Sequence, residues 1–225
     1  MSLNLFKYHT NPETLTGFDL ATDKVPYLAW DHFRANHEEL RKREHLWTES
    51  AEYSYEYATG VLSGERFVKG EDAIATDSGY SYAYARDVLK GRFEKGEDAI
   101  ATDVYYSYFY AKDVLKGERV EKIEDAIATS AGYSYRYAED VLKGKRVEKI
   151  EDAIATSAVH SFWYAKGVLR GERVEKIEDA IATSAKYSFW YAKGVLRGER
   201  FVKGEDAIRG SEYKERYEEL TGVKL

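Results

Sequence analysis

The sequence SFWYAKGVLR occupies residues 161–170, and the same ten residues return at 188–197. Both copies lie in a longer repeat that carries an E-D-A-I motif. The aspartates of this motif are Asp72, Asp98, Asp125, Asp152, Asp179 and Asp206. Successive aspartates are 27 residues apart, except for a first step of 26. A fixed period of this length is typical of proteins in which each repeat packs on its neighbours.

Each repeat contains two helical signals joined by short connections. The first is E-D-A-I-A-T, whose acidic residues suit a helix N-terminus. The second follows an Asp or Ser, both good N-cap residues, runs through Y-S-Y-x-Y-A-x-x-V-L, and stops at a glycine. The Y-S-Y-x-Y alternation also fits a strand, but the caps and the helical spacing of Ala, Val and Leu favour a helix. The 26-residue step has lost one residue in a connection, so 64–70 and its equivalents are predicted as loops.

The apolar residues of the second helix indicate how the repeats pack. On a helical wheel, those of 131–142 cover about 200°, which suits a helix with a neighbour on each side. A Val or Phe in each connection is expected to fill the gap between repeats, at Phe67, Phe93, Val120, Val147, Val174 and Phe201. We therefore predict an all-α protein, an α-solenoid of short helix-turn-helix repeats.

The two ends differ from the repeats. Residues 1–50 are predicted to form an irregular leader and, over 27–50, a longer and more charged N-terminal capping helix. The tandem 27-residue helical repeats occupy 51–210. Residues 211–225 keep Tyr213, Tyr217 and Leu220 among charged residues, and we expect a polar C-terminal capping helix there.

Composition excludes several classes of protein. The chain has no cysteine, which removes disulfides and thiol catalysis. No run approaches the ~18 apolar residues of a membrane span, and no secretory leader opens the chain, so we expect a cytoplasmic protein without a membrane partner. The net charge of −6 argues against general binding to a polyanion.

The repeat resembles a known viral motif. The string A-I-A-x4-Y-x-Y-x-Y-A-x2-V-L-K-G is similar to a short tandem motif in repeat proteins of tailed phages and other large DNA viruses. The resemblance covers roughly residues 51–210. It implies a helical repeat fold and a viral accessory protein in the host cytoplasm, and it supplies no catalytic or binding residues.

Positions that vary between repeats are candidates for recognition, because the repeated positions build the scaffold. The slot before the third aromatic residue holds Glu56, Ala83, Phe109, Arg136, Trp163 and Trp190. In a helix, the aromatic residue in this slot (i) lies on the same face as basic residues at i+3 and i+7, which predicts three basic-aromatic stripes. The candidate partner-binding residues are Trp163, Lys166 and Arg170; Trp190, Lys193 and Arg197; and Phe109, Lys112 and Lys116. In the two Trp repeats a nearby Asp is replaced by Gly167 and Gly194, which removes a negative charge.

The alternative is that these residues only pack. Trp163 and Trp190 can fold over the hydrophobic seam, and the lysines can lie across aromatic rings as solvated neighbours or near helix C-termini for electrostatic reasons. For the two tryptophans, the sequence supports partner binding and packing about equally. For the lysines alone it favours packing.

Other candidate chemistry is weak. His32, His37 and His45 lack a metal-binding spacing, and His160 replaces a repeated Tyr, which predicts a core substitution. The repeated E-D pairs are interpreted as helix N-terminal charges. No nucleotide-binding or nucleophile motif is present. We therefore expect no catalytic, cofactor or metal site and no enzyme activity.

The leading hypothesis is a non-enzymatic recognition module that binds and blocks or sequesters a partner protein, such as a host-defence protein. The second is nucleic-acid or nucleotide binding on the same strip, with rings stacking on bases. The third is a purely structural rod, which the near identity of 147–173 and 174–200 also fits.

Overall fold

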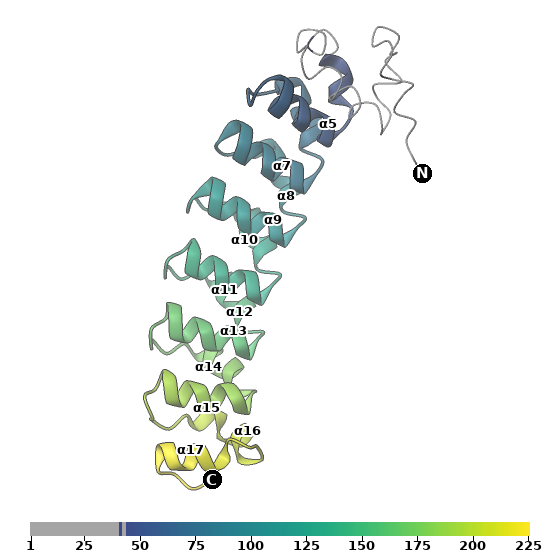
Figure 1. Cartoon of the computed structure of the whole chain (residues 1–225). Coiled ribbons are helices and arrows are strands. Elements are labelled where there is room, and N and C mark those ends of the chain that lie inside the picture. Colours follow the sequence, from purple (N-terminus) through teal and green to yellow (C-terminus); the bar gives the residue numbers. More distant parts are fainter. Residues whose placement is uncertain (1–40, 42–43) are drawn as a thin grey trace, which may run out of the picture. The chain divides into compact units, whose positions relative to one another are not determined.

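The computed structural model describes residues 41 and 44–225, which are helical and contain no strand (Figure 1). The predicted leader and most of the predicted N-terminal capping helix lie outside the described residues. The chain divides into two compact units, one up to Thr102 and the other from Asp103. Within the described part, no helix is long and apolar enough to cross a membrane. The all-α helical repeat fold predicted from the sequence is confirmed.

The described part of the chain contains thirteen α-helices, and most helices of the Y-S-Y type pack against the short helix that follows them. Unit 1 contains α5 (Ala51–Glu56), α6 (Glu71–Ile74), α7 (Ser78–Tyr84) and α8 (Glu97–Ile100). Unit 2 contains α9 (Val104–Phe109), α10 (Glu121–Ile127), α11 (Ala131–Asp140), α12 (Glu148–Ile154), α13 (Ala158–Trp163), α14 (Glu175–Ala182), α15 (Ala185–Gly194), α16 (Glu205–Arg209) and α17 (Lys214–Thr221).

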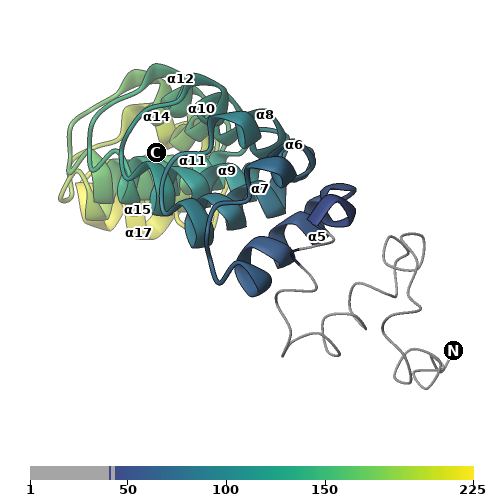
Figure 2. The same ribbon diagram turned by 90° about the horizontal axis from the view of Figure 1, so that it is seen from above.

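Unit 2 has two layers. The helices α9, α11, α13 and α15 each contact the next one in this order, and α10, α12 and α14 form a second row behind them (Figure 2). A buried serine ties the two layers together, because its hydroxyl donates to an isoleucine carbonyl at the end of the preceding short helix: Ser134 to Ile127, Ser161 to Ile154, and Ser188 to Ile181. The front row therefore presents one helix per repeat, in register.

The front helices end differently from a regular α-helix. Several finish in a π-helical turn, such as Tyr110–Leu115 and Tyr164–Val168. The glycine stop is confirmed, but the left-handed backbone begins one residue earlier. The non-glycine residues with positive φ are Ser63, Lys90, Lys116, Lys143, Arg170 and Arg197, with φ between 50° and 57°. In most repeats the helix therefore ends before the Lys or Arg that precedes the glycine.

This left-handed position gives a first prediction. Lys143→Gly should raise the free energy of unfolding by about 0.5–1 kcal/mol, because the steric cost of a left-handed Cβ exceeds the entropy that Gly adds to the unfolded chain. Lys143→Ala removes the same side chain but keeps the Cβ, so it should give no such gain. Urea denaturation of both variants measures the difference in their free energies of unfolding. Equal stability of the two would show that the left-handed backbone at residue 143 is not strained by a Cβ.

The E-D motif is only partly a pair of helix N-terminal charges. Its aspartate is exposed and pairs with a lysine of the next repeat, as in Lys95–Asp72 at 2.7 Å and Lys149–Asp125 at 2.5 Å. Its glutamate is buried instead. Glu151 is 3% exposed and accepts hydrogen bonds from Arg146 Nε at 2.6 Å, Arg146 Nη2 at 2.9 Å and the Tyr164 hydroxyl at 2.8 Å.

This Arg–Glu–Tyr triad recurs along the chain. Further copies include Arg66–Glu71–Tyr84, Arg119–Glu124–Tyr137, Arg173–Glu178–Tyr191 and Arg200–Glu205–Tyr217. Burial alone would raise the pKa of Glu151, but the hydrogen bonds from Arg146 and Tyr164 lower it below its usual range. The triad fixes the loop, the short helix and the front helix of one repeat to each other.

The gap between the layers is filled in two ways. Phe67, Phe93 and Phe201 each precede a buried glycine by three residues, whereas Val120, Val147 and Val174 precede a buried isoleucine. A Cβ on Gly96 would lie 2.4 Å from Phe93 Cδ1 and 2.8 Å from Ser81 Cβ. The Phe ring therefore excludes any side chain at the glycine. All six of these Phe and Val side chains are buried, as expected for residues that fill a gap.

Candidate recognition surface

Two tryptophans are exposed on neighbouring front helices. Trp163 ends α13 and is 45% exposed, and Trp190 in α15 is 37% exposed. Each ring lies edge-on against the buried Phe that precedes it, at 5.2 Å for Phe162 and 5.5 Å for Phe189. Their exposure agrees with the sequence prediction. The rings are thus held at the surface by a core contact.

A lysine one turn later lies over each ring. Lys166 Nζ is 5.4 Å from the Trp163 ring centroid, and Lys193 Nζ is 5.4 Å from that of Trp190. Such cation–π contacts orient the ammonium group while leaving it in solvent. Among residues 44–225, neither ammonium has an ion-pair partner. These two positive charges are therefore available to a ligand.

The loss of nearby acids explains why these charges stay available. In an earlier repeat of unit 2, Asp140 accepts from the Tyr108 hydroxyl and from Lys112 Nζ, the latter at 2.8 Å. Gly194 stands in the place of this aspartate for Lys166, and Leu220, which follows the buried Tyr217 by three residues as Asp140 follows Tyr137, stands in its place for Lys193. The Tyr that precedes the Trp position is Phe162 or Phe189 in these repeats. Hydroxyl and carboxylate are lost together. The substitution converts a closed polar network into an open basic surface.

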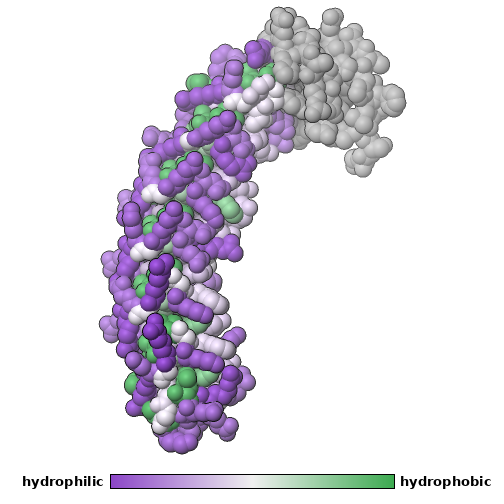
Figure 3. Space-filling model, turned by 60° about the vertical axis from the view of Figure 1, so that its left-hand side comes forward, coloured by the Kyte–Doolittle hydropathy of each residue, from purple (hydrophilic) through white to green (hydrophobic). Residues whose placement is uncertain are grey.

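The basic surface extends to both neighbouring helices. Arg136 in α11 is exposed and lies 6.0 Å from the Tyr133 ring, and Arg216 in α17 lies 4.9 Å from the Phe189 ring. We call the set Arg136, Trp163, Lys166, Trp190, Lys193 and Arg216 the aromatic-basic strip. Figure 3 shows hydrophobic and less polar groups interspersed among the hydrophilic ones along the described part of the chain. The strip spans α11, α13, α15 and α17 of unit 2.

The third predicted stripe is less accessible. Phe109 is half-buried between Tyr105 at 4.7 Å and Tyr108 at 5.0 Å, and Lys112 is engaged by Asp140. The exposed ring of this repeat is Tyr105, at 48%. Sequence reasoning missed Tyr105, although its slot varies in the same way, as Gly79, Tyr105, Gly132, Val159 and Lys186.

The last basic residue of each predicted stripe is not on the helix. Lys116, Arg170 and Arg197 have φ of 50°, 52° and 57°, so the straight i, i+3, i+7 arrangement does not form. Arg170 instead lines a surface pocket of about 490 Å³ with Lys143 and Gly167. The helical wheel failed here because it assumes a regular α-helix up to the glycine, whereas the π-turn and the left-handed residue end it sooner.

A second pocket adjoins Trp163. It has a volume of about 420 Å³ and is lined by Tyr133, Tyr135, Arg136, His160 and Trp163 among others. His160 is half-buried there, so the prediction of a core substitution is only partly right. Burial, and then the charge of Arg136, lower the pKa of His160, which keeps the imidazole neutral at pH 7. The pocket thus offers aromatic walls and one guanidinium.

Comparisons of the chain with family models, curated proteins and solved structures find no match. The surface is therefore interpreted from its own chemistry. Over the described residues, no three His, Asp or Glu side chains gather in a way that could hold a metal ion. What the strip offers is non-covalent contact: two exposed indoles, each beside a free ammonium group, with a guanidinium at each end.

Proposed function

We propose that the protein is a non-enzymatic recognition module whose aromatic-basic strip binds an acidic segment of a partner protein and so blocks or sequesters it. The observation that carries the proposal is the pair of exposed tryptophans with unpaired lysines in consecutive repeats. Tryptophan and arginine dominate protein-binding hot spots. Exposed aromatic rings in series are typical of contact surfaces.

The strip favours a protein over a nucleic acid. One face of each indole is occupied by a lysine ammonium, which leaves less ring surface for stacking on bases. The exposed Glu139 interrupts the positive charge, and the whole chain carries −6. A phosphate backbone would meet this repulsion along its length, whereas a short acidic segment would not. The resemblance of the repeat to viral repeat motifs supports a host protein as the partner.

Trp163→Ala together with Trp190→Ala should abolish partner recovery while leaving the fold intact. Hot-spot tryptophans contribute about 2 kcal/mol or more each, so the double variant should bind roughly 1,000-fold more weakly if the two effects add. Affinity capture from host lysate, followed by titration of the captured protein, measures the loss. Val202→Ala, which truncates a 63% exposed side chain outside the strip, is the matched control.

Two outcomes would contradict this proposal. Recovery of the same protein by the double Trp variant would show that the strip is not the site. Loss of recovery from wild type after nuclease treatment would show that a nucleic acid, rather than a protein, occupies it. Lys166→Glu with Lys193→Glu should also prevent binding, because the partner segment is acidic.

A further inference from the structure

The one shortened repeat lies in unit 1 and has lost a specific residue. The connection is Gly64-Glu65-Arg66-Phe67 in the preceding repeat but Gly91-Arg92-Phe93 here, so the glutamate is missing. In one repeat of unit 2 this glutamate is paired with the repeat before it: Glu172 Oε1 accepts a hydrogen bond from Arg146 Nη1 at 2.8 Å. The equivalent of Arg146 in unit 1 is Arg66. The deletion therefore removes the carboxylate that would face Arg66.

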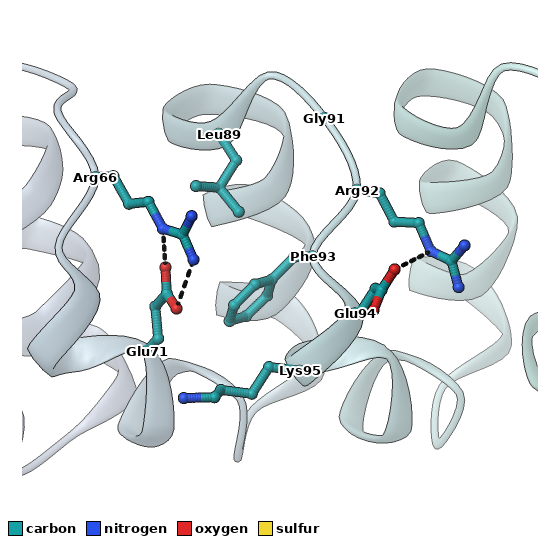
Figure 4. Close-up of a pocket in the computed structure, with 8 residues that line it drawn as sticks. All are labelled: Arg66, Glu71, Leu89, Gly91, Arg92, Phe93, Glu94 and Lys95. Carbon is teal, nitrogen blue, oxygen red and sulfur yellow. Dashed lines mark hydrogen bonds and ion pairs between the residues drawn. The ribbon is translucent and has the colours of Figure 1, made fainter.

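A pocket of about 530 Å³ opens at this place (Figure 4). Arg66 and Arg92 lie on opposite sides of it, and the side chains of Leu89 and Phe93 lie between them. Arg66 donates Nε to Glu71 Oε1 at 2.6 Å and Nη2 to Glu71 Oε2 at 3.1 Å. Within residues 44–225, Nη1 of Arg66 makes no hydrogen bond. The pocket thus combines a solvent-exposed guanidinium edge, which has no protein partner among the described residues, with an apolar wall.

The remaining charges of the pocket are already paired. Arg92 Nε donates to Glu97 at 2.6 Å and lies 3.9 Å from Glu94, and Lys95 pairs with Asp72 at 2.7 Å. Among the described residues of the pocket, Arg66 therefore offers a guanidinium edge that faces solvent rather than a protein group. Arg146 shows what satisfies it, because it binds Glu151 and Glu172 at once. An arginine in this architecture accommodates two carboxylates.

We propose that the pocket beside Arg66 binds a carboxylate carried on a short apolar stem. The carboxylate takes the position of the missing glutamate and accepts from Arg66, and the stem lies against Leu89 and Phe93. Charge-assisted hydrogen bonds from a guanidinium favour a carboxylate over a neutral amide. The ligand is a free organic acid or the side chain of an acidic residue in another protein. This site belongs to unit 1 and does not depend on the aromatic-basic strip.

The test uses the full chain, with NMR detection of the arginine Nε–Hε groups. Butanoate should shift the Arg66 signal saturably, with a Kd of about 1–10 mM for so small a ligand. Butanamide, which has the same shape without the charge, should not. Arg119 is an internal reference, because Lys145 occupies the glutamate position that follows it. A blocked peptide with one glutamate distinguishes the sources: tighter binding than butanoate assigns the site to a protein side chain, and weaker binding to a free acid.

Insertion of glutamate between Gly91 and Arg92 rebuilds the 27-residue repeat and should weaken butanoate binding at least tenfold. Arg66→Lys should also weaken butanoate binding, because it keeps the positive charge beside Glu71 but loses the forked guanidinium. This variant serves as the test if the insertion variant does not fold. The proposal is overturned if butanamide or chloride shifts Arg66 as butanoate does, if Arg119 responds equally, or if a folded variant binds butanoate like wild type.

Discussion

Arg146→Met is expected to lower the free energy of unfolding at pH 7 by about 2–3 kcal/mol. It leaves the carboxylate of Glu151, which is 3% exposed, with the Tyr164 hydroxyl as its one remaining side-chain donor. Removing one partner of a fully buried ion pair costs about 3–5 kcal/mol. We expect a loss smaller than that of a fully buried pair, because the Arg146 side chain is 43% exposed and water can reach the space it leaves.

The loss should depend on pH in a defined direction. The triad holds the pKa of Glu151 below its ordinary value of 4.5. Its contribution to wild-type stability is therefore complete above that value and disappears as pH falls through the lower, folded-state pKa. In Arg146→Met, burial without the guanidinium favours the protonated acid. The stability gap between wild type and variant should narrow as pH falls below about 4.5.

A second variant separates charge from packing. Arg146→Met combined with Glu151→Gln removes the buried charge and should recover part of the lost stability at pH 7, because an amide is less costly to bury than a carboxylate. Urea denaturation at pH 7 and pH 4 measures all three proteins. A gap that is equal at both pH values, or a double variant no more stable than Arg146→Met, would show that the triad acts through packing alone.

Gly96→Ile should be among the most destabilising single substitutions in the chain, at about 3 kcal/mol. Even the first carbon of the new side chain would lie 2.4 Å from Phe93 Cδ1, inside a buried position. Phe93→Val alone should cost about 2 kcal/mol, because it leaves a cavity that the surrounding structure fills only partly. Thermal unfolding followed by circular dichroism measures both.

The double variant Phe93→Val/Gly96→Ile should be far more stable than the sum of its parts. It changes F-E-K-G at 93–96 to V-E-K-I, the sequence at 120–123, 147–150 and 174–177. In those repeats the short helix begins at the glutamate, as at Glu121, whereas Glu94–Gly96 is a 3₁₀ turn. We expect a favourable coupling of about 2–3 kcal/mol. If the stability losses of Phe93→Val and Gly96→Ile simply add in the double variant, a Val–Ile pair does not replace the Phe–Gly pair in this connection.

Much of the fold was predictable because its signals are local. The N-caps at Asp77, Asp103 and Ser130 accept hydrogen bonds from the front-helix backbone as expected, and the glycine stops follow. The exposure of Trp163 and Trp190 was also predictable, since the residue type at their position varies widely, while the position of Phe162 is always Tyr or Phe and that of Tyr164 is always Tyr. Periodicity and internal comparison need no knowledge of how distant residues meet.

The parts that failed depend on contacts across the repeat. The Glu of each E-D pair carries the same local signal as its Asp, but only the packing of Tyr164 and Arg146 around Glu151 shows which carboxylate is buried. The place of Arg170 depends on the π-turn before it, which a regular wheel does not include. The equivalents of Arg146, Glu151 and Tyr164 are the same residue types in all six repeats of the sequence, and this invariance was the signal that could have predicted the triad.

The sequence by itself determined that this chain is a stack of helix pairs and which positions of each pair vary. It determined this because helix caps, glycine stops and the 27-residue period act over short distances. Only the tertiary structure decided that Lys166 and Lys193 remain unpaired and that Arg66 faces a pocket. Those properties depend on which side chains of adjacent repeats come within hydrogen-bonding distance, and folding alone sets that distance.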